Sequence, residues 1–213
     1  MSCETRKNIL LFGGTFDPVH NGHLIVSRAA AERLGAEKVI LIPSALPPHK
    51  VSLPVSDARD RLRMVQEAVR KEELFAVSDC ELQRAGPSYT LDTVRYFRKV
   101  YGEQTELFWL IGADSVEELT GWYRVKKLVN ECTIVTAPRT EDVSKGLAVL
   151  PKVLHAEQIE HIRKYVLDTP RIDISATEIR RRVAQGRSIS FLVPPAVEEY
   201  IFKQKLYQTE VAE

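Results

Sequence analysis

Residues 13–24, "GGTFDPVHNGHL", place two glycines, an aspartate and two histidines between an apolar run and a helical pattern. The apolar run at 9–12 predicts a strand, and the apolar spacing in 22–33 predicts a helix that Gly35 can terminate. Gly13 and Gly14 would let the backbone turn sharply and a ligand approach closely. The start of the helix that follows is a ready anion-binding site.

His20 and His23 lie three positions apart, beside the expected start of this helix. At that place two imidazoles can neutralise charge on phosphate oxygens. Two other interpretations stay open: one surface and one capping histidine, or a metal site made by Asp17 with both histidines. The stretch matches neither a P-loop nor a dinucleotide-binding fingerprint.

The length and composition indicate one globular domain, or one domain with a subdomain, and argue against several classes of protein. The chain has 213 residues, a net charge of +1, 44% hydrophobic and 28% charged residues, which argues against a general nucleic-acid binder. Its cysteines, Cys3, Cys80 and Cys132, are far apart and favour free thiols in a reducing cytoplasm. No apolar run approaches the roughly 20 residues of a membrane span, so no membrane partner is expected.

Strand and helix patterns alternate along the chain. Strands are expected at 9–12, 39–42, 74–77, 107–111 and 133–137, and helices between them at 22–33, 56–71 (with Ser56 as N-cap) and 91–100. Wholly apolar strands separated by helices predict a doubly wound parallel α/β sheet, whose ligands bind at the carboxyl ends of the strands. Two further helices, at 175–185 and 195–204, are expected to pack beside the last strand as a C-terminal cap.

The stretch "ISATEIRRRV", residues 174–183, predicts a second phosphate site. Ser175 and Glu178 have the spacing of a capping box, and Thr177 adds a hydroxyl in the first turn. Arg180 follows about one turn later, and a helix N-terminus with hydroxyls and an arginine suits a triphosphate. A capped surface helix with solvated arginines is the alternative.

Three middle segments carry further candidates. "PPHK", residues 47–50, can deliver the cation of Lys50 to a phosphate, and "GPSYTLDT", residues 86–93, leads into a helix whose first N–H groups could hold a carboxylate. In "GADSVEELTGWY", residues 112–123, Asp114 could accept bonds from ribose hydroxyls or cap a helix. Trp122 and Tyr123 could stack on an aromatic ring or belong to the core.

The first stretch resembles the (T/S)-F-D-P-x-H-x-G-H signature of the nucleotidyltransferase superfamily, and the stretch from Ile174 resembles its I-S-(S/T)-T-x-I-R signature, with Ala176 where serine is common. With these two signatures and the motifs PPHK, SYT-x-DT and GAD…WY, which occur between them, the chain resembles the bacterial nicotinate-nucleotide adenylyltransferases over about residues 8–207. At "APRT", residues 137–140, Arg139 follows the proline that the family's arginine often precedes, so no phosphate role is assigned to it.

The resemblance implies a Rossmann-like nucleotidyltransferase fold with C-terminal helices, in a single domain 1–213 whose part 174–207 completes the ATP site. It implies that ATP is bound by Gly13, Gly14, Thr15, Phe16, His20, His23, Ser175, Thr177 and Arg180. It implies that the nicotinate nucleotide is bound by Lys50, Tyr89, Thr90, Asp114, Trp122 and Tyr123.

The implied reaction is adenylyl transfer from ATP to nicotinate mononucleotide, which gives nicotinate adenine dinucleotide and pyrophosphate in NAD biosynthesis. His20, His23, Lys50 and Arg180 would be the catalytic residues, and Mg²⁺ would be held mainly by substrate phosphates. The partners are then these small molecules, with no nucleic acid and no membrane, in the cytoplasm; a homo-oligomer is left open. The alternatives are an adenylyltransferase with nicotinamide mononucleotide or phosphopantetheine as acceptor, and a nucleotide-binding sensor without turnover.

Overall fold

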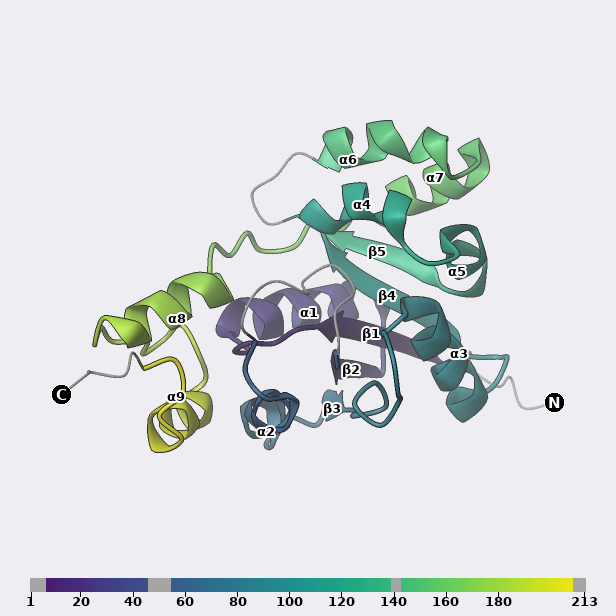
Figure 1. The fold of residues 1–213 in the computed structure, drawn as a ribbon. Helices are drawn as coiled ribbons and strands as arrows, with labels where there is room; N and C mark the ends of the chain where they lie inside the picture. Colours follow the sequence, from purple (N-terminus) through teal and green to yellow (C-terminus); the bar gives the residue numbers. More distant parts are fainter. Residues whose placement is uncertain (1–6, 46–54, 139–142, 209–213) are drawn as a thin grey trace.

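A computed structural model describes residues 7–45, 55–138 and 143–208 of the chain. Its centre is a five-stranded parallel sheet with the strand order β3-β2-β1-β4-β5 (Figure 1). The strands are β1 Asn8–Gly14, β2 Lys38–Pro43, β3 Phe75–Val77, β4 Glu106–Gly112 and β5 Thr133–Ala137. The prediction of a doubly wound parallel sheet is therefore confirmed, with small shifts at the strand ends.

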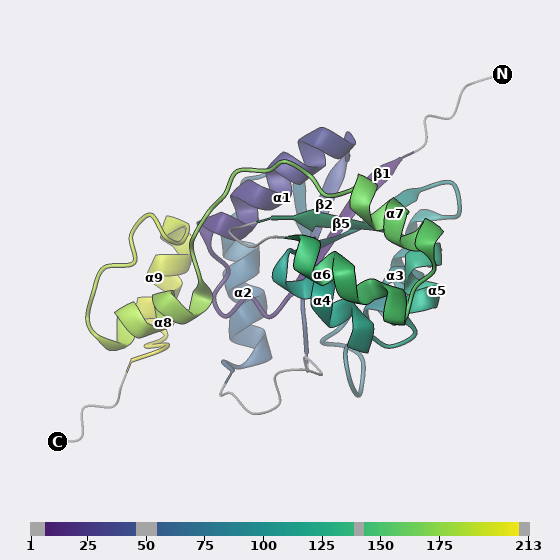
Figure 2. The same cartoon turned by 90° about the horizontal axis from the view of Figure 1, so that it is seen from above.

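Side chains of β1 alternate between two hydrophobic cores, one on each face of the sheet. Leu10 and Phe12 join one core, while Ile9 and Leu11 join the other. The first core is completed by α1 Asn21–Leu34, α2 Ala58–Val69, α8 Ala176–Ala184 and α9 Pro195–Lys203. The second is completed by α3 Thr90–Tyr101, α4 Asp114–Glu118, α5 Val125–Glu131 and α7 Ala156–Lys164, with the 3₁₀ turns η1 Leu119–Gly121 and η2 Leu150–Lys152. Helix α6, Val143–Val149, packs against α4. Figure 2 shows the two groups from above.

Local signals explain where the helices begin and end. Gly35 ends α1 in the left-handed conformation (φ 58°), as the sequence predicts. The N-cap of α2 is Asp57, whose carboxylate accepts a hydrogen bond from Arg59 N (2.7 Å), so the prediction of Ser56 was wrong. The main chain of Ser56 is engaged elsewhere: its N–H donates to the carboxylate of Asp17 (3.2 Å).

The two C-terminal helices do not pack beside β5, and this expectation was wrong. Helix α9 packs against α2, and its buried Val197 and Ile201 join the core that contains Met64 of α2. The apolar face of α9 thus covers α2 instead of the sheet edge. The segment next to β5 is instead the one that contains Val166, which forms a parallel bridge with Thr136 of β5. Figure 1 shows α8 and α9 grouped near α2, away from α5.

The connections on either side of β1 create a crevice at the carboxyl ends of the strands. β1 pairs with β2 on one edge and with β4 on the other. The helix after β1 covers one face of the sheet, and the helix after β4 covers the opposite face. Ligands of doubly wound sheets bind where the connections diverge in this way. No helix within the described ranges is long and apolar enough to span a membrane.

Candidate functional site

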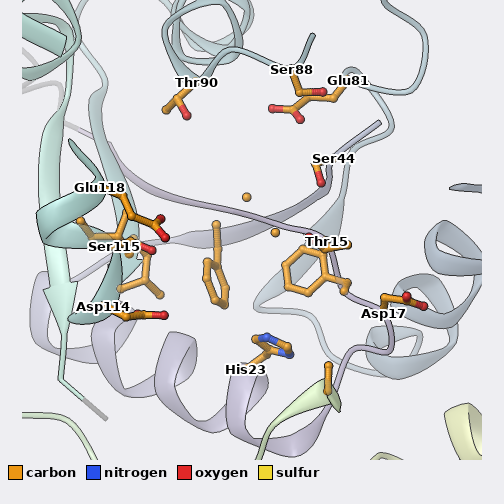
Figure 3. A pocket seen from close by; sticks show the side chains of 18 of the residues that line it. Thr15, Asp17, His23, Ser44, Glu81, Ser88, Thr90, Asp114, Ser115 and Glu118 are labelled. Atoms are coloured by element: carbon orange, nitrogen blue, oxygen red, sulfur yellow. The ribbon is translucent and has the colours of Figure 1, made fainter. Parts of the chain in front are cut away.

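A pocket of about 680 Å³ opens at the carboxyl ends of β1 and β4 (Figure 3). Its volume is in the range of sites for small molecules. It brings together all the site residues predicted from the sequence that the structure describes: Gly13, Gly14, Thr15, Phe16, His20, His23, Tyr89, Thr90, Asp114, Trp122, Tyr123, Ser175, Thr177 and Arg180. Lys50, with the rest of the PPHK stretch, lies outside the described residues, as does Arg139.

The two histidines form a rigid pair at the start of α1. His20 is the N-cap, and its main-chain N–H donates to Nδ1 of His23 (3.2 Å). Since Nδ1 accepts this bond, the proton of a neutral His23 ring lies on Nε2, which is then its donor. The rings stack with centroids 3.6 Å apart, and the edge of Phe16 packs on His23. Because His20 is only 1% exposed, this pair is held in one orientation at the pocket wall.

The two glycines at the end of β1 make room for neighbouring side chains, and they do not form the turn. Both Gly13 and Gly14 belong to β1, so the turn begins at Thr15. A Cβ on Gly13 would lie 2.6 Å from the ring of Trp109 on β4, and a Cβ on Gly14 would lie 3.1 Å from the ring of Phe16. A side chain at position 13 would force the buried ring of Trp109 to shift, and one at position 14 would press on the ring of Phe16.

The amino end of α8 reaches the same pocket from the far end of the chain. Ser175 caps the helix, because its Oγ accepts a hydrogen bond from Glu178 N (3.2 Å). Arg180 Nη1 donates to the main-chain oxygen of Asp17 (2.7 Å), and Nη2 lies 3.4 Å from the hydroxyl of Thr177. The start of α8 is thereby tied to the loop between β1 and α1, which leads to the two histidines. Two helix N-termini, each a site of partial positive charge, face one pocket.

An aromatic wall and a third helix start form the other end of the pocket. The ring of Tyr89, at the N-cap of α3, stacks on the ring of Tyr123 with centroids 4.3 Å apart. Thr90 begins α3, and in Figure 3 it lies beside Ser88 and Glu81, opposite His23. Asp114, at the start of α4, lines the side wall. The pocket therefore has the histidines at one end, and at the end near α3 it has a stacked tyrosine pair together with the polar side chains of Thr90, Ser88 and Glu81.

Several lining residues are missing from the set predicted from the sequence. They include Asp17, Ser44, Glu81, Ser88 and Trp109. Glu81 is 4% exposed, and its carboxylate accepts a hydrogen bond from Thr93 Oγ1 (2.6 Å). Burial raises the pKa of Glu81, against the opposing effect of its hydrogen bonds and of Arg84. It lies in an irregular segment that has no motif spacing, so no sequence signal indicated it.

The alternative of a metal site in the first loop is not supported. Within residues 7–45, 55–138 and 143–208, no three His, Cys, Asp or Glu side chains gather in a way that could hold a metal ion. The carboxylate of Asp17 instead accepts hydrogen bonds from the hydroxyl of Tyr207 (2.6 Å) and from Ser56 N (3.2 Å).

Known proteins resemble this chain in sequence. A family model described as cytidylyltransferase-like matches residues 11–182. A protein of Neisseria meningitidis serogroup B, named "Probable nicotinate-nucleotide adenylyltransferase", is 42% identical over 205 residues, covering 95% of this chain and 99% of that protein. A protein of the same name from Dehalococcoides mccartyi is 39% identical over 197 residues, covering 92% of this chain and 95% of that protein.

Solved structures share the fold. A nicotinic acid mononucleotide adenylyltransferase of Plasmodium falciparum, solved in complex with NaAD, superposes with a TM-score of 0.72. The match covers 95% of this chain and 98% of that one at 17% sequence identity. At this identity the likeness establishes the architecture.

Glu81→Gln tests the environment of the buried carboxyl. Because burial raises its pKa above the ordinary 4.5, the folded state keeps a proton that the unfolded state loses as the pH rises. The wild type therefore loses stability with rising pH in this window, and the glutamine variant does not. We expect the unfolding free energy of the variant minus that of the wild type to increase as the pH rises from 4.5 through the raised pKa.

Glu131→Gln is the matched contrast, measured by urea unfolding at the same pH values. Hydrogen bonding to Arg95 lowers the pKa of Glu131, so its contribution to stability is lost as the pH falls through that lowered value. The unfolding free energy of Glu131→Gln minus that of the wild type should therefore decrease as the pH rises towards 4.5. Parallel pH trends for the two variants would contradict the assignment of Glu81.

Proposed function

This chain belongs to the cytidylyltransferase-like family, and within it to the nicotinate-nucleotide adenylyltransferases, and we propose that it transfers the adenylyl group of ATP to nicotinate mononucleotide. The observation that carries the proposal is that the starts of α1 and α8 face one end of a pocket whose other end has a stacked tyrosine pair. A triphosphate suits the first end, and a pyridine ring suits the second.

The reaction needs no protein nucleophile. An oxygen of the 5′-phosphate of nicotinate mononucleotide attacks the α-phosphorus of ATP, a new P–O bond forms, and the bond to the β-phosphate oxygen breaks. Pyrophosphate leaves with the electron pair, and nicotinate adenine dinucleotide remains. The attacking phosphate is already an anion at neutral pH, so catalysis consists of aligning two anions and offsetting their repulsion.

The histidine end of the pocket supplies this offset. The donor on His23, the hydroxyl of Thr177 and the guanidinium of Arg180 lie on its wall and would contact the triphosphate, with His20 holding the ring of His23 in place. Lys50 is proposed as a further cation. The C-terminal part 174–207 then completes the ATP site of a single domain.

Mg²⁺ is the proposed metal. The donor set fits an ion held by phosphate oxygens and water, because no carboxylate cage is present among the described residues. The ion would neutralise charge that develops on the phosphates.

The end near α3 favours an acid over an amide. Tyr89, the N-cap of α3, and Thr90, its first residue, both line the pocket, so the partial positive charge at the start of this twelve-residue helix lies at the pocket wall. Asp92 in the first turn offsets part of that charge. A nicotinate carboxylate gains from that charge, whereas an uncharged nicotinamide does not. Asp114, on the side wall, is placed to accept bonds from a ribose.

The function is tested by the choice of acceptor. We expect pyrophosphate release with ATP and Mg²⁺ to have a kcat/KM for nicotinate mononucleotide about tenfold or more above that for nicotinamide mononucleotide, since one charge-assisted interaction is lost with the amide. Phosphopantetheine serves as the third acceptor. Preferred use of phosphopantetheine would move the chain to another acceptor class, and ATP binding without turnover on any acceptor would indicate a sensor.

His20→Ala and His23→Ala test the histidine end. Both variants should fold and lose most turnover. His23→Ala removes a donor to a developing phosphate charge, which typically costs about 3 kcal/mol, or roughly 100-fold in rate. His20→Ala keeps the main-chain N–H but removes the ring that stacks on His23 and fixes the direction of that donor. Circular dichroism checks the fold, and the acceptor assay gives kcat. Near wild-type rates in both variants would refute the assignment of the histidines.

A further inference from the structure

We propose that Tyr207 is a positioning residue for the ATP site, because it fastens the C-terminal end of the described chain to the loop between β1 and α1, which leads to the two histidines. The proposal rests on the function given above. It concerns a residue outside the predicted sequence motifs that does not line the pocket.

The contact is a hydrogen bond to a buried carboxylate. The hydroxyl of Tyr207 donates to Oδ1 of Asp17 (2.6 Å), across 190 positions of sequence. Asp17 is 4% exposed and lies three positions before His20, on the pocket wall. Its other oxygen accepts from Ser56 N (3.2 Å), and its main-chain oxygen accepts from Arg180. Tyr207 therefore bonds the residue at which the loop, α8 and the approach to α2 meet.

A buried arginine supports the same loop. Arg61 on α2 is 2% exposed; its Nη1 donates to the main-chain oxygen of Thr15 (2.7 Å) and its Nε donates to that of Ser56 (3.0 Å). The loop between β1 and α1 is thus held on its inner side by Arg61 and Tyr207 and on its pocket side by Arg180.

The chemistry of Tyr207 suits a permanent donor. Burial and the adjacent carboxylate of Asp17 both raise the pKa of the phenol, so the hydroxyl keeps its proton at neutral pH. Without this donor, a buried carboxylate oxygen would lose its partner, which costs more than an exposed hydrogen bond. The loop would move so that water could reach that oxygen, and the histidines would be displaced from their positions beside the triphosphate.

Tyr200 provides a matched control. Its hydroxyl donates to Oδ1 of Asp60 (2.8 Å), so it too forms a tyrosine–aspartate hydrogen bond from the C-terminal part of the chain. This aspartate belongs to α2, and neither Tyr200 nor Asp60 lines the pocket. Tyr207→Phe and Tyr200→Phe each remove one hydroxyl. They differ in whether the aspartate belongs to the loop between β1 and α1, and in burial, since Asp17 is buried and Asp60 is only partly buried.

The test measures the Kd of ATP with Mg²⁺ by titration calorimetry without acceptor, and then KM for each substrate. We expect Tyr207→Phe to raise the Kd and KM of ATP about five- to tenfold, because part of the energy of the lost hydrogen bond to a charged group appears as weaker ATP binding. KM for nicotinate mononucleotide should change less than about twofold. Tyr200→Phe should leave all three near wild type. If Tyr207→Phe folds poorly, Asp17→Ala and Asp60→Ala remove the acceptor of each tyrosine instead. Asp17→Ala should still weaken ATP binding, although the loss of a negative charge from the pocket wall would by itself favour a polyphosphate.

Three results would overturn the proposal: an unchanged ATP Kd in Tyr207→Phe, equal weakening in both tyrosine variants, or an equal rise in KM for both substrates. The proposed function fails separately. If wild type binds ATP and the variant weakens it, yet nicotinate mononucleotide is not adenylylated, the positioning role stands and the acceptor assignment falls.

Discussion

The hydrogen bond from Arg180 Nη1 to the main-chain oxygen of Asp17 (2.7 Å) is the contact on which the site depends. It joins residues 163 positions apart, and it holds the amino end of α8 against the loop that starts α1. Each helix start alone would attract an anion only weakly. Because the two helix starts are already held at one pocket, a polyphosphate that binds between them would not have to bring them together.

The fold supplies this arrangement through the sheet and through the packing of α9. Because β1 and β4 are adjacent and parallel, the loops that follow them open at the same edge. Helix α9 packs on α2, so the C-terminal part lies on the α1 side of the sheet, where α8 can reach the pocket. Had it packed beside β5, as expected from the sequence, Arg180 would have been placed at the sheet edge. The position of α8 thus follows from where α9 finds an apolar partner.

Most of the fold and about half of the residues that line the pocket could be predicted from the sequence, for identifiable reasons. The apolar strands are local signals, as is Gly35, whose left-handed backbone conformation ends α1. The residues within each sequence motif are also close to one another in the chain. The partners of α9 depend on contacts between distant segments, so local patterns missed them. The cap of α2 is a local bond between Asp57 and Arg59 N, but Ser56 and Asp57 are adjacent and both are common N-cap residues, so the pattern could not choose between them. Glu81 and Tyr207 stand in irregular stretches, where only the folded chain reveals that one reaches the pocket and the other reaches Asp17.

The most direct test of this account is a crystal structure with a non-hydrolysable ATP analogue and Mg²⁺. We expect the triphosphate to lie between the starts of α1 and α8, within hydrogen-bonding distance of His23 and of Thr177 or Arg180. A triphosphate bound away from both helix starts would contradict it, whatever the activity of the protein.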